Sequence, residues 1–266
     1  MFGKAVAVGV TLSLVGCSGS DTRSPTDLPG APKTVQTKAL ELGAEALQAQ
    51  PPVQALSAYL DGFHFYNGHP KVQMEAHHYC AVLNEEVIQC VIYDGNTAQA
   101  RLMGVEYIIS ERLFAGLPAQ EKALWHSHAH EVKSGQLVAP GIPLVAENRL
   151  MTKLANTYGK TWHTWHTDQD NPLPLGMPQL MMGFTADGQA DPAMVRQRDQ
   201  RLGIDSTERR AARAGIRPNP VQPGADAWKT GKVVQIKDST GHTHLHPRPA
   251  TPEDTNARSS PSSKQP

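Results

Sequence analysis

The sequence lacks any excess of charge of one sign. Lysine plus arginine and aspartate plus glutamate each number 25, so the formal net charge is zero with histidine neutral. No run of basic residues interleaved with aromatic residues is present. Because nucleic acids are bound chiefly by positive charge that neutralises their phosphates, we expect no nucleic-acid partner.

Signatures of several common catalytic classes are absent as well. The chain contains no Gly-x-Ser-x-Gly, no glycine-rich phosphate loop after a strand and no His-Glu-x-x-His. Those patterns belong to serine hydrolases, nucleotide-binding enzymes and zinc proteases. The sequence therefore names no reaction by motif, and it shows no internal repeat of fixed period.

The first seventeen residues have the pattern of an export signal. Lys4 precedes an apolar stretch at residues 5–15 that is too short to cross a bilayer. The following segment, Leu14-Val15-Gly16-Cys17, resembles the bacterial lipobox, so we expect acyl chains such as palmitate on Cys17. Ser18 favours sorting to the periplasmic face of the outer membrane, which predicts a lipid-anchored protein of the bacterial cell envelope. The alternative is an ordinary cleaved signal peptide with an incidental cysteine.

Composition divides the chain into four parts. After the signal at residues 1–17, residues 18–36 are mostly Ser, Thr, Asp, Pro and Gly, which predicts a flexible tether. Residues 237–266 are polar and rich in proline and serine, which predicts a disordered tail. We expect a single folded domain at residues 37–236, which is long enough to bury a core.

Hydrophobic periodicity predicts both helices and strands in this domain. Apolar residues at helical spacing predict helices at residues 35–50, 53–60, 118–133 and 144–158. The charged segment 191–213 is predicted to be helical in two pieces around Gly203. Runs rich in β-branched and aromatic residues predict strands at residues 101–110 and 160–167, and a hairpin of residues 75–83 and 87–93 with a three-residue loop. Because these strands cluster without regular strand–helix–strand alternation, we predict an α+β fold, with an antiparallel sheet flanked by helices.

Several long segments resemble the oil body-associated protein family. They include YLDGFHFYNG at residues 59–68, QMEAHHYC at residues 73–80 and GVEYIISERLF at residues 104–114. WHSH at residues 125–128 and the segments at residues 133–141 and 173–182 continue the match, so the resemblance covers residues 38–235. The resemblance implies a domain of undefined molecular function and an association with lipid surfaces. It implies no catalytic residues, and the lipobox, the tether, the tail, His130 and His166 depart from the plant pattern.

Histidine is the residue type that suggests chemistry. Nine of the twelve histidines fall between His64 and His166. Imidazole binds divalent ions such as zinc when three or four side chains converge, usually with a carboxylate. The ligands that we predict are His77, His78, His126, His128 and Glu131, with Glu75 and Glu106 as alternative carboxylates. The alternative is that these histidines are polar core and surface residues bonded to backbone or carboxylate groups.

Two cysteines lie within the predicted hairpin. Pairing its strands places Cys80 opposite Cys90, at a separation that permits a cross-strand disulfide. The alternative is two buried thiols that pack without a covalent bond, because relatives of this domain live in the reducing cytosol.

Two classes of function follow from these patterns. The first is a membrane-anchored, non-catalytic module that binds lipids or envelope proteins, which the lipobox and the family resemblance favour. The second is a metal-dependent enzyme that uses the histidine and glutamate cluster. The presence of a stoichiometric metal discriminates between them.

Overall fold

The computed structural model describes residues 21–237. The predicted lipidation site at Cys17 and most of the predicted tail lie outside these residues. Within the described range, no helix has both the length and the apolar character that a membrane crossing requires.

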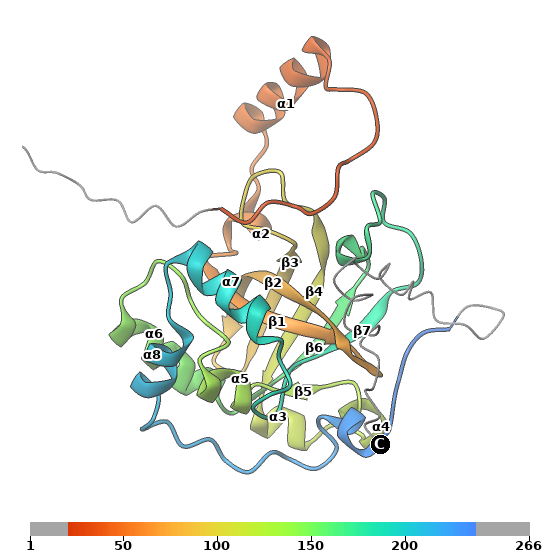
Figure 1. Cartoon of the computed structure of the whole chain (residues 1–266). Helices are drawn as coiled ribbons and strands as arrows, with labels where there is room; N and C mark the ends of the chain where they lie inside the picture. The colour runs from red at the N-terminus through yellow and green to blue at the C-terminus, as the bar shows by residue number, and fades with distance from the viewer. Residues whose placement is uncertain (1–20, 238–266) are drawn as a thin grey trace, which may run out of the picture.

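The centre of the domain is an antiparallel sheet that closes on itself as a barrel (Figure 1). Its six strands are β1 (Ala58–Tyr66), β2 (His69–Asn84), β3 (Val87–Tyr93), β4 (Leu102–Ser110), β6 (Thr157–His163) and β7 (Gln179–Met182). Strand β4 pairs with β6 and β7 pairs with β1, so the ends of the sheet meet. An even number of strands lets every neighbouring pair be antiparallel. The short strand β5 (His126–Ser127) adds to β6.

Strand β1 corrects a prediction, because the second predicted helix covers its beginning. Residues Ala58–Tyr66 form a strand, and helix α2 is limited to Pro51–Gln54. Side chains alternate along a strand, so Leu60 and His64 reach the barrel interior while Phe63 and Phe65 pack in an apolar cluster outside it. Since both faces are buried, the two-residue alternation of polarity that marks a strand is missing from this segment.

Helices surround the barrel on several sides (Figure 1). They are α1 (Val35–Leu47), α2, α3 (Glu111–Ala115), α4 (Ala119–Lys122), α5 (Ala129–Ser134), α6 (Leu144–Leu154), α7 (Pro192–Leu202) and α8 (Ser206–Ala212). Short 3-10 turns lie at Thr167–Gln169 and Ala227–Thr230. Helix α1 projects from the body and buries none of its residues. The predicted α+β domain is therefore present, with an antiparallel sheet and helices, but the closure of the sheet was not predicted.

Two buried arginines hold the segment after β5 against the barrel. Arg213 donates to the carbonyl oxygens of Val132 and Leu137 at 2.9 and 2.7 Å. Arg198 donates to the Gln136 carbonyl at 2.9 Å and to the Asp61 carboxylate at 2.6 Å. Leu137 consequently lies in the barrel interior, where its Cδ1 atom fits beside a glycine of β1. These contacts place the residues of β5 and α5 next to the interior.

The predicted hairpin is present with a shorter turn. Strand β2 ends at Asn84 and β3 begins at Val87, so the connection is two residues rather than three. Cys80 lies opposite Cys90 in this hairpin, and the structure joins their sulfur atoms in a disulfide.

Part of the segment predicted as a tether contacts the barrel. The Thr22 backbone exchanges hydrogen bonds with Asn96, whose side chain accepts from the Thr22 amide. The Ser24 hydroxyl donates to Asp94 at 2.6 Å. These contacts exist because the loop between β3 and β4 presents side-chain oxygens to the passing backbone.

Candidate metal centre

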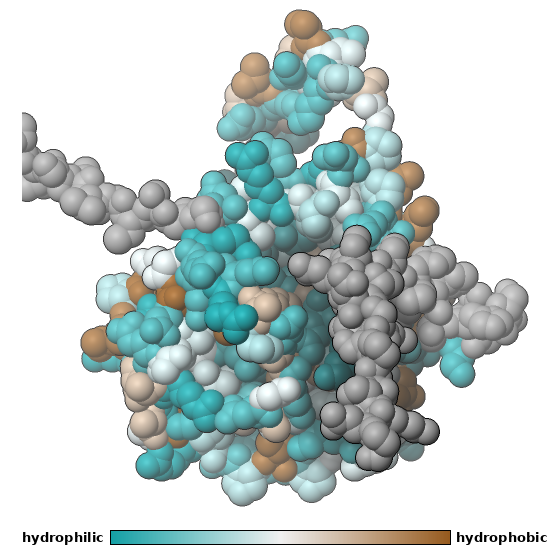
Figure 2. Space-filling view, in the orientation of Figure 1, coloured by the Kyte–Doolittle hydropathy of each residue, from teal (hydrophilic) through white to brown (hydrophobic). Residues whose placement is uncertain are grey.

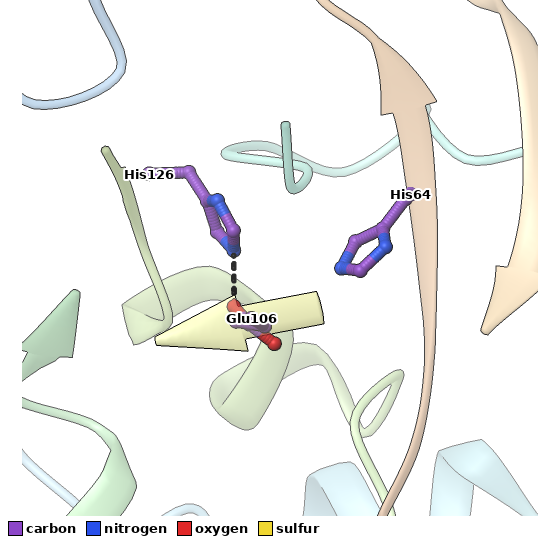
Figure 3. Close-up of side chains that lie close together, drawn as sticks. All are labelled: His64, Glu106 and His126. Atoms are coloured by element: carbon purple, nitrogen blue, oxygen red, sulfur yellow. Dashed lines mark ion pairs between the residues drawn. The ribbon is translucent and has the colours of Figure 1, made fainter. Parts of the chain in front are cut away.

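Imidazole and carboxylate groups from five strands and one helix segment gather inside the barrel. None of them is more than 6% exposed. We call this group the metal centre; its members are His64 of β1, His78 of β2, Glu106 of β4, His126 of β5, His163 of β6, and His128 and Glu131 at helix α5. Figure 3 shows His64, Glu106 and His126 converging from different strands. The barrel therefore has a polar interior layer between apolar ones.

Glu106 lies at the middle of this group. Its Oε1 atom is 3.3 Å from Nε2 of His126 and 3.3 Å from Nε2 of His128. Its Oε2 atom is 3.1 Å from Nε2 of His78. The other two histidines contact each other, because Nδ1 of His64 lies 3.4 Å from Nε2 of His163. One carboxylate thus has imidazole nitrogens on both of its oxygens.

The described residues contain three sets of three possible ligand atoms within 4.8 Å of one another, and two of these sets belong to the metal centre. One set is His64, Glu106 and His126, and the other is His126, His128 and Glu131. His126 belongs to both sets. A single ion can therefore be reached by a carboxylate and several imidazoles with small side-chain movements, which is the ligand number that zinc and similar ions use.

Glycines make the room that these side chains occupy. A Cβ atom at Gly159 would overlap Oε1 of Glu106 and lie 2.8 Å from Nε2 of His126. A Cβ atom at Gly183 would overlap Oε1 of Glu131. The two positions therefore accept only glycine if the carboxylates keep these places.

The electrostatic environment separates the charged and neutral members. Burial raises the pKa of Glu106, but hydrogen bonds with His126, His128 and His78 outweigh it and hold that pKa well below its usual range. Burial lowers the pKa of His64 and lowers that of His163 to about 3. These two imidazoles are therefore neutral at physiological pH, which is the form that binds a metal.

The other two shifted groups hold protons more tightly. Burial lowers the pKa of His126, but the hydrogen bond and the charge of Glu106 outweigh it, so that pKa is raised. Burial raises the pKa of Glu131 to about 7, although His126 and His128 oppose the shift. A proton on His126 or Glu131 makes the metal centre less negative, so it competes with a bound cation.

Several polar atoms of the metal centre have no hydrogen-bond partner among the described residues. They are Nδ1 of His126, Nδ1 of His163 and Oε1 of Glu131, whereas Nε2 of His78 and Nε2 of His126 have the Glu106 contacts given above. Buried polar groups without partners are rare in native proteins because each costs about 1–3 kcal/mol. The adjoining cavity has a volume of about 10 Å³, and its lining combines polar and mostly apolar residues: His64, His78, Glu106, His128 and Glu131 with Leu60, Gly62, Phe63, Ile108, Leu137 and Leu154. A cavity of that size holds about one water molecule or ion.

His77 lies in a different cluster, outside the barrel wall. Adjacent residues of a strand point to opposite faces, so His77 cannot join His78. Its Nδ1 atom lies 3.0 Å from Asp61 and its Nε2 atom 3.5 Å from Glu75. These carboxylates already form ion pairs with Arg198 and Arg201, respectively. The two arginines balance the two carboxylates, so this cluster has no negative charge left for a cation.

The structure therefore brings together four of the five predicted ligands: His78, His126, His128 and Glu131 converge, and His77 does not. The predicted ligand set did not include His64 or His163, and it gave Glu106 only as an alternative to Glu131. Glu106 and His163 lie on strands that were predicted, and both face the interior because of the register between β4 and β6. That register could not be read from either segment alone. His64 was missed because no strand was predicted for β1.

A family model and individual relatives both match most of the chain. A family model described as a protein of unknown function, DUF1264, matches residues 50–217. Oil body-associated protein 2A of Zea mays is 46% identical over 204 residues, covering 75% of this chain and 81% of that protein. Oil body-associated protein 1B of Arabidopsis thaliana is 44% identical over 221 residues, covering 82% and 92%. No solved structure matches the chain.

These relatives correct the predicted location. The prediction of a lipid-anchored protein of the bacterial envelope, made from residues 1–18, is wrong: the relatives that the chain matches over most of their length are plant oil body-associated proteins. That short amino-terminal pattern carries less information than agreement over a whole domain. By both the family model and these relatives, the chain belongs to the oil body-associated protein family, whose molecular function is unknown.

Proposed function

We propose that this domain binds one divalent transition-metal ion in the metal centre. The observation that carries the proposal is the convergence of buried imidazole and carboxylate groups, several of whose polar atoms lack a hydrogen-bond partner among the described residues, beside a small cavity that His64, Glu106 and Glu131 line. An ion there would supply the missing partner to several of these atoms at once. No lysine or arginine lines the cavity, so no permanently positive side chain borders it.

The donor set indicates the class of ion. Imidazole nitrogen together with carboxylate oxygen suits zinc, iron, nickel or copper, whereas magnesium and calcium prefer oxygen ligands alone. His126 is the ligand common to both sets of donors, and Glu106 supplies the negative charge. We therefore propose His126 and Glu106 as the two principal ligands of the ion.

The size of the site favours a structural rather than a catalytic role for the ion. Pockets for organic ligands have volumes of about 300–1,000 Å³, and the cavity at the metal centre is far smaller. Every candidate ligand is buried. An ion held here would crosslink β1, β4, β5 and α5, and so fix the closure of the barrel. The domain is then a metal-stabilised, non-catalytic module.

Metal analysis of the full chain, purified without a histidine tag, tests this proposal. After dialysis against a weak chelator, mass spectrometry should find one transition-metal ion per chain. The double variant E106Q/H126Q should lose it, whereas H77Q, which changes the buried histidine outside the barrel, should keep it. Wild-type protein that is folded by circular dichroism but free of metal, and that takes up none of zinc, iron, nickel or copper, would contradict the proposal.

A second function, association with a lipid surface, is favoured by helix α1. Its four large apolar side chains Val35, Leu40, Leu42 and Leu47 are each at least 67% exposed, and hydrophobic atoms are visible on this projection in Figure 2. The relatives are named for oil bodies. Inserting such side chains into a lipid surface removes apolar area from water, at about 25 cal/mol per Å².

Flotation of the full chain with triacylglycerol droplets coated in phosphatidylcholine tests this second function. The variant L40D/L47D should reduce droplet binding about tenfold or more, because these two leucines share one side of α1 and no longer leave water together. The matched control is L173D/L175D, which changes two exposed leucines in the loop before β7. Equal losses in both variants, or none in the first, would argue against α1 as the lipid-binding element.

A further inference from the structure

We propose that Cys80 and Cys90 are a redox-controlled part of the metal centre, and that on reduction their two sulfur atoms become ligands of the bound ion. This inference rests on the proposed function, because it concerns the same ion. It adds a change of ligand set, and therefore of metal preference, that depends on the state of one disulfide.

The two cysteines face the barrel interior beside the metal centre. Cys80 lies directly opposite Cys90 across β2 and β3, and Cys90 lies directly opposite Glu106 across β3 and β4. Side chains directly opposite in an antiparallel pair have Cβ atoms about 4.5–5.5 Å apart. His78 precedes Cys80 by two residues and therefore shares its face of β2. The disulfide thus has a proposed ligand beside each of its cysteines.

The surroundings of the disulfide are otherwise apolar. Both cysteines are at most 3% exposed, and they pack with Leu60, Ile88 and Ile108. Leu60 and Ile108 also line the cavity of the metal centre. The strand register places Glu106 and His78 of the metal centre next to this apolar cluster.

Reduction changes what the sulfur atoms can bind. In the disulfide, each sulfur is bonded to the other and is a poor donor to a metal. A dithiol reductant supplies two electrons and two protons: the sulfur–sulfur bond breaks, a thiol forms on each cysteine, and the reductant becomes a disulfide. Each side chain can then rotate about its Cα–Cβ bond toward Glu106 and His78. Each thiol that binds the ion releases its proton to solvent.

Sulfur ligands would alter the chemistry of the centre. Imidazole and carboxylate ligands accept many divalent ions, whereas thiolates select zinc and other soft ions. Zinc–sulfur bonds are about 2.3 Å and zinc–nitrogen bonds about 2.0–2.1 Å, so the two states are distinguishable by X-ray absorption. Oxidation of the pair would return the ion to nitrogen and oxygen ligands.

Cobalt(II) substitution of the full chain tests the inference. All samples carry C17S, so that the thiol count reports only Cys80 and Cys90. Protein refolded with a dithiol should show two free thiols and, with cobalt(II), a near-ultraviolet sulfur-to-cobalt charge-transfer band. The oxidised protein should bind cobalt(II) without that band. With zinc, X-ray absorption spectra of the reduced form should show two sulfur atoms at about 2.3 Å from the zinc ion.

The double variant C80S/C90S is the matched control, and it should bind cobalt(II) without the band under both conditions. Reduced protein that binds cobalt(II) with the same spectrum as the oxidised form would overturn the inference and leave the proposed metal binding intact. Absence of cobalt(II) binding in both redox states would instead refute the proposed function itself. Circular dichroism of each sample shows whether a lost signal comes from unfolding.

Discussion

At the scale of single residues, the proposed metal centre depends on small side chains as much as on its imidazole and carboxylate groups. Glu106 can reach His126 and His128 because Gly159, on the neighbouring strand, has no side chain. The Glu106 carboxylate occupies the space in which a side chain at residue 159 would lie. A change at the glycine is therefore a change at the proposed site.

We predict that G159A loses the bound ion and destabilises the fold. The added methyl group would overlap the Glu106 carboxylate, and overpacking of this kind costs about 1–3 kcal/mol. G43A is the matched control, because nothing lies within 4 Å of its added methyl group and alanine favours the helix α1. Urea unfolding and metal content measure both effects; a G159A protein with normal metal content would contradict the role given to this glycine.

We also predict that metal affinity rises with pH. The raised pKa of His126 and the pKa of Glu131, about 7, mean that both groups hold protons in mildly acidic solution. An ion must displace those protons to bind, so binding is weaker at pH 6 than at pH 8, where the Glu131 carboxyl has lost its proton. Competition with a chromophoric chelator at the two pH values measures the difference. An affinity independent of pH would mean that neither group is a ligand.

At the scale of secondary-structure elements, helix α7 is attached to the barrel by buried charge. Arg198 and Asp61 are both fully buried and 2.6 Å apart, and the guanidinium also lies over the Phe63 ring. The pair orients α7 across β1 while an apolar cluster covers the remainder of that face. Helix α7 is therefore oriented by the Arg198–Asp61 ion pair, which lies within a larger hydrophobic contact surface.

Removing one partner of this pair should be costly. In R198M the Asp61 carboxylate would remain buried beside His77 without its guanidinium, and breaking such a pair costs about 3–5 kcal/mol. In the control R210M the lost partner is Asp187, and both side chains of that pair are more than half exposed. Exposed pairs contribute at most about 1 kcal/mol. Chemical denaturation should separate the two variants, and similar stabilities would show that the buried pair does not attach α7.

Elements also show which sequence patterns predict structure. Residues 192–202 and 206–212 form two helices around Gly203, as predicted, because each has an aspartate at its amino-terminal cap that bonds the backbone locally. Strand β1 was predicted partly as a helix. Its neighbours β2 and β7 and the covering helix decide its conformation, and none of these lies within the segment itself.

At the scale of the whole molecule, closure of the sheet creates an interior that a flat sheet would lack. Strands β1 and β4 lie apart in the chain order, yet β7 and β6 connect them into one cylinder. An ion inside that cylinder would link the strands to α5, so its binding free energy would add to the stability of the whole fold.

We predict that a chelator lowers the melting temperature of the full chain. Free ion at 100 times its Kd stabilises a native protein by about 2.7 kcal/mol. For a domain of this size each kcal/mol corresponds to about 2–4 °C, so the shift should be about 5–11 °C. Scanning calorimetry with zinc and then with excess chelator measures it. The variant E106Q should show little shift, and an equal shift there would mean that the ion binds elsewhere.

The sequence by itself determined the features that depend on neighbours along the chain: the strand at residues 102–110, the hairpin that pairs Cys80 with Cys90, and the two capped helices near the carboxyl end. It also identified histidines as the residues to examine. Tertiary structure alone decided that β4 pairs with β6, that His78 faces inward while His77 faces α7, and that Glu106 meets His126. The physical reason is that a closed sheet converts strand register and side-chain direction into a shared interior, and both are fixed by hydrogen bonds between segments that lie far apart in the chain.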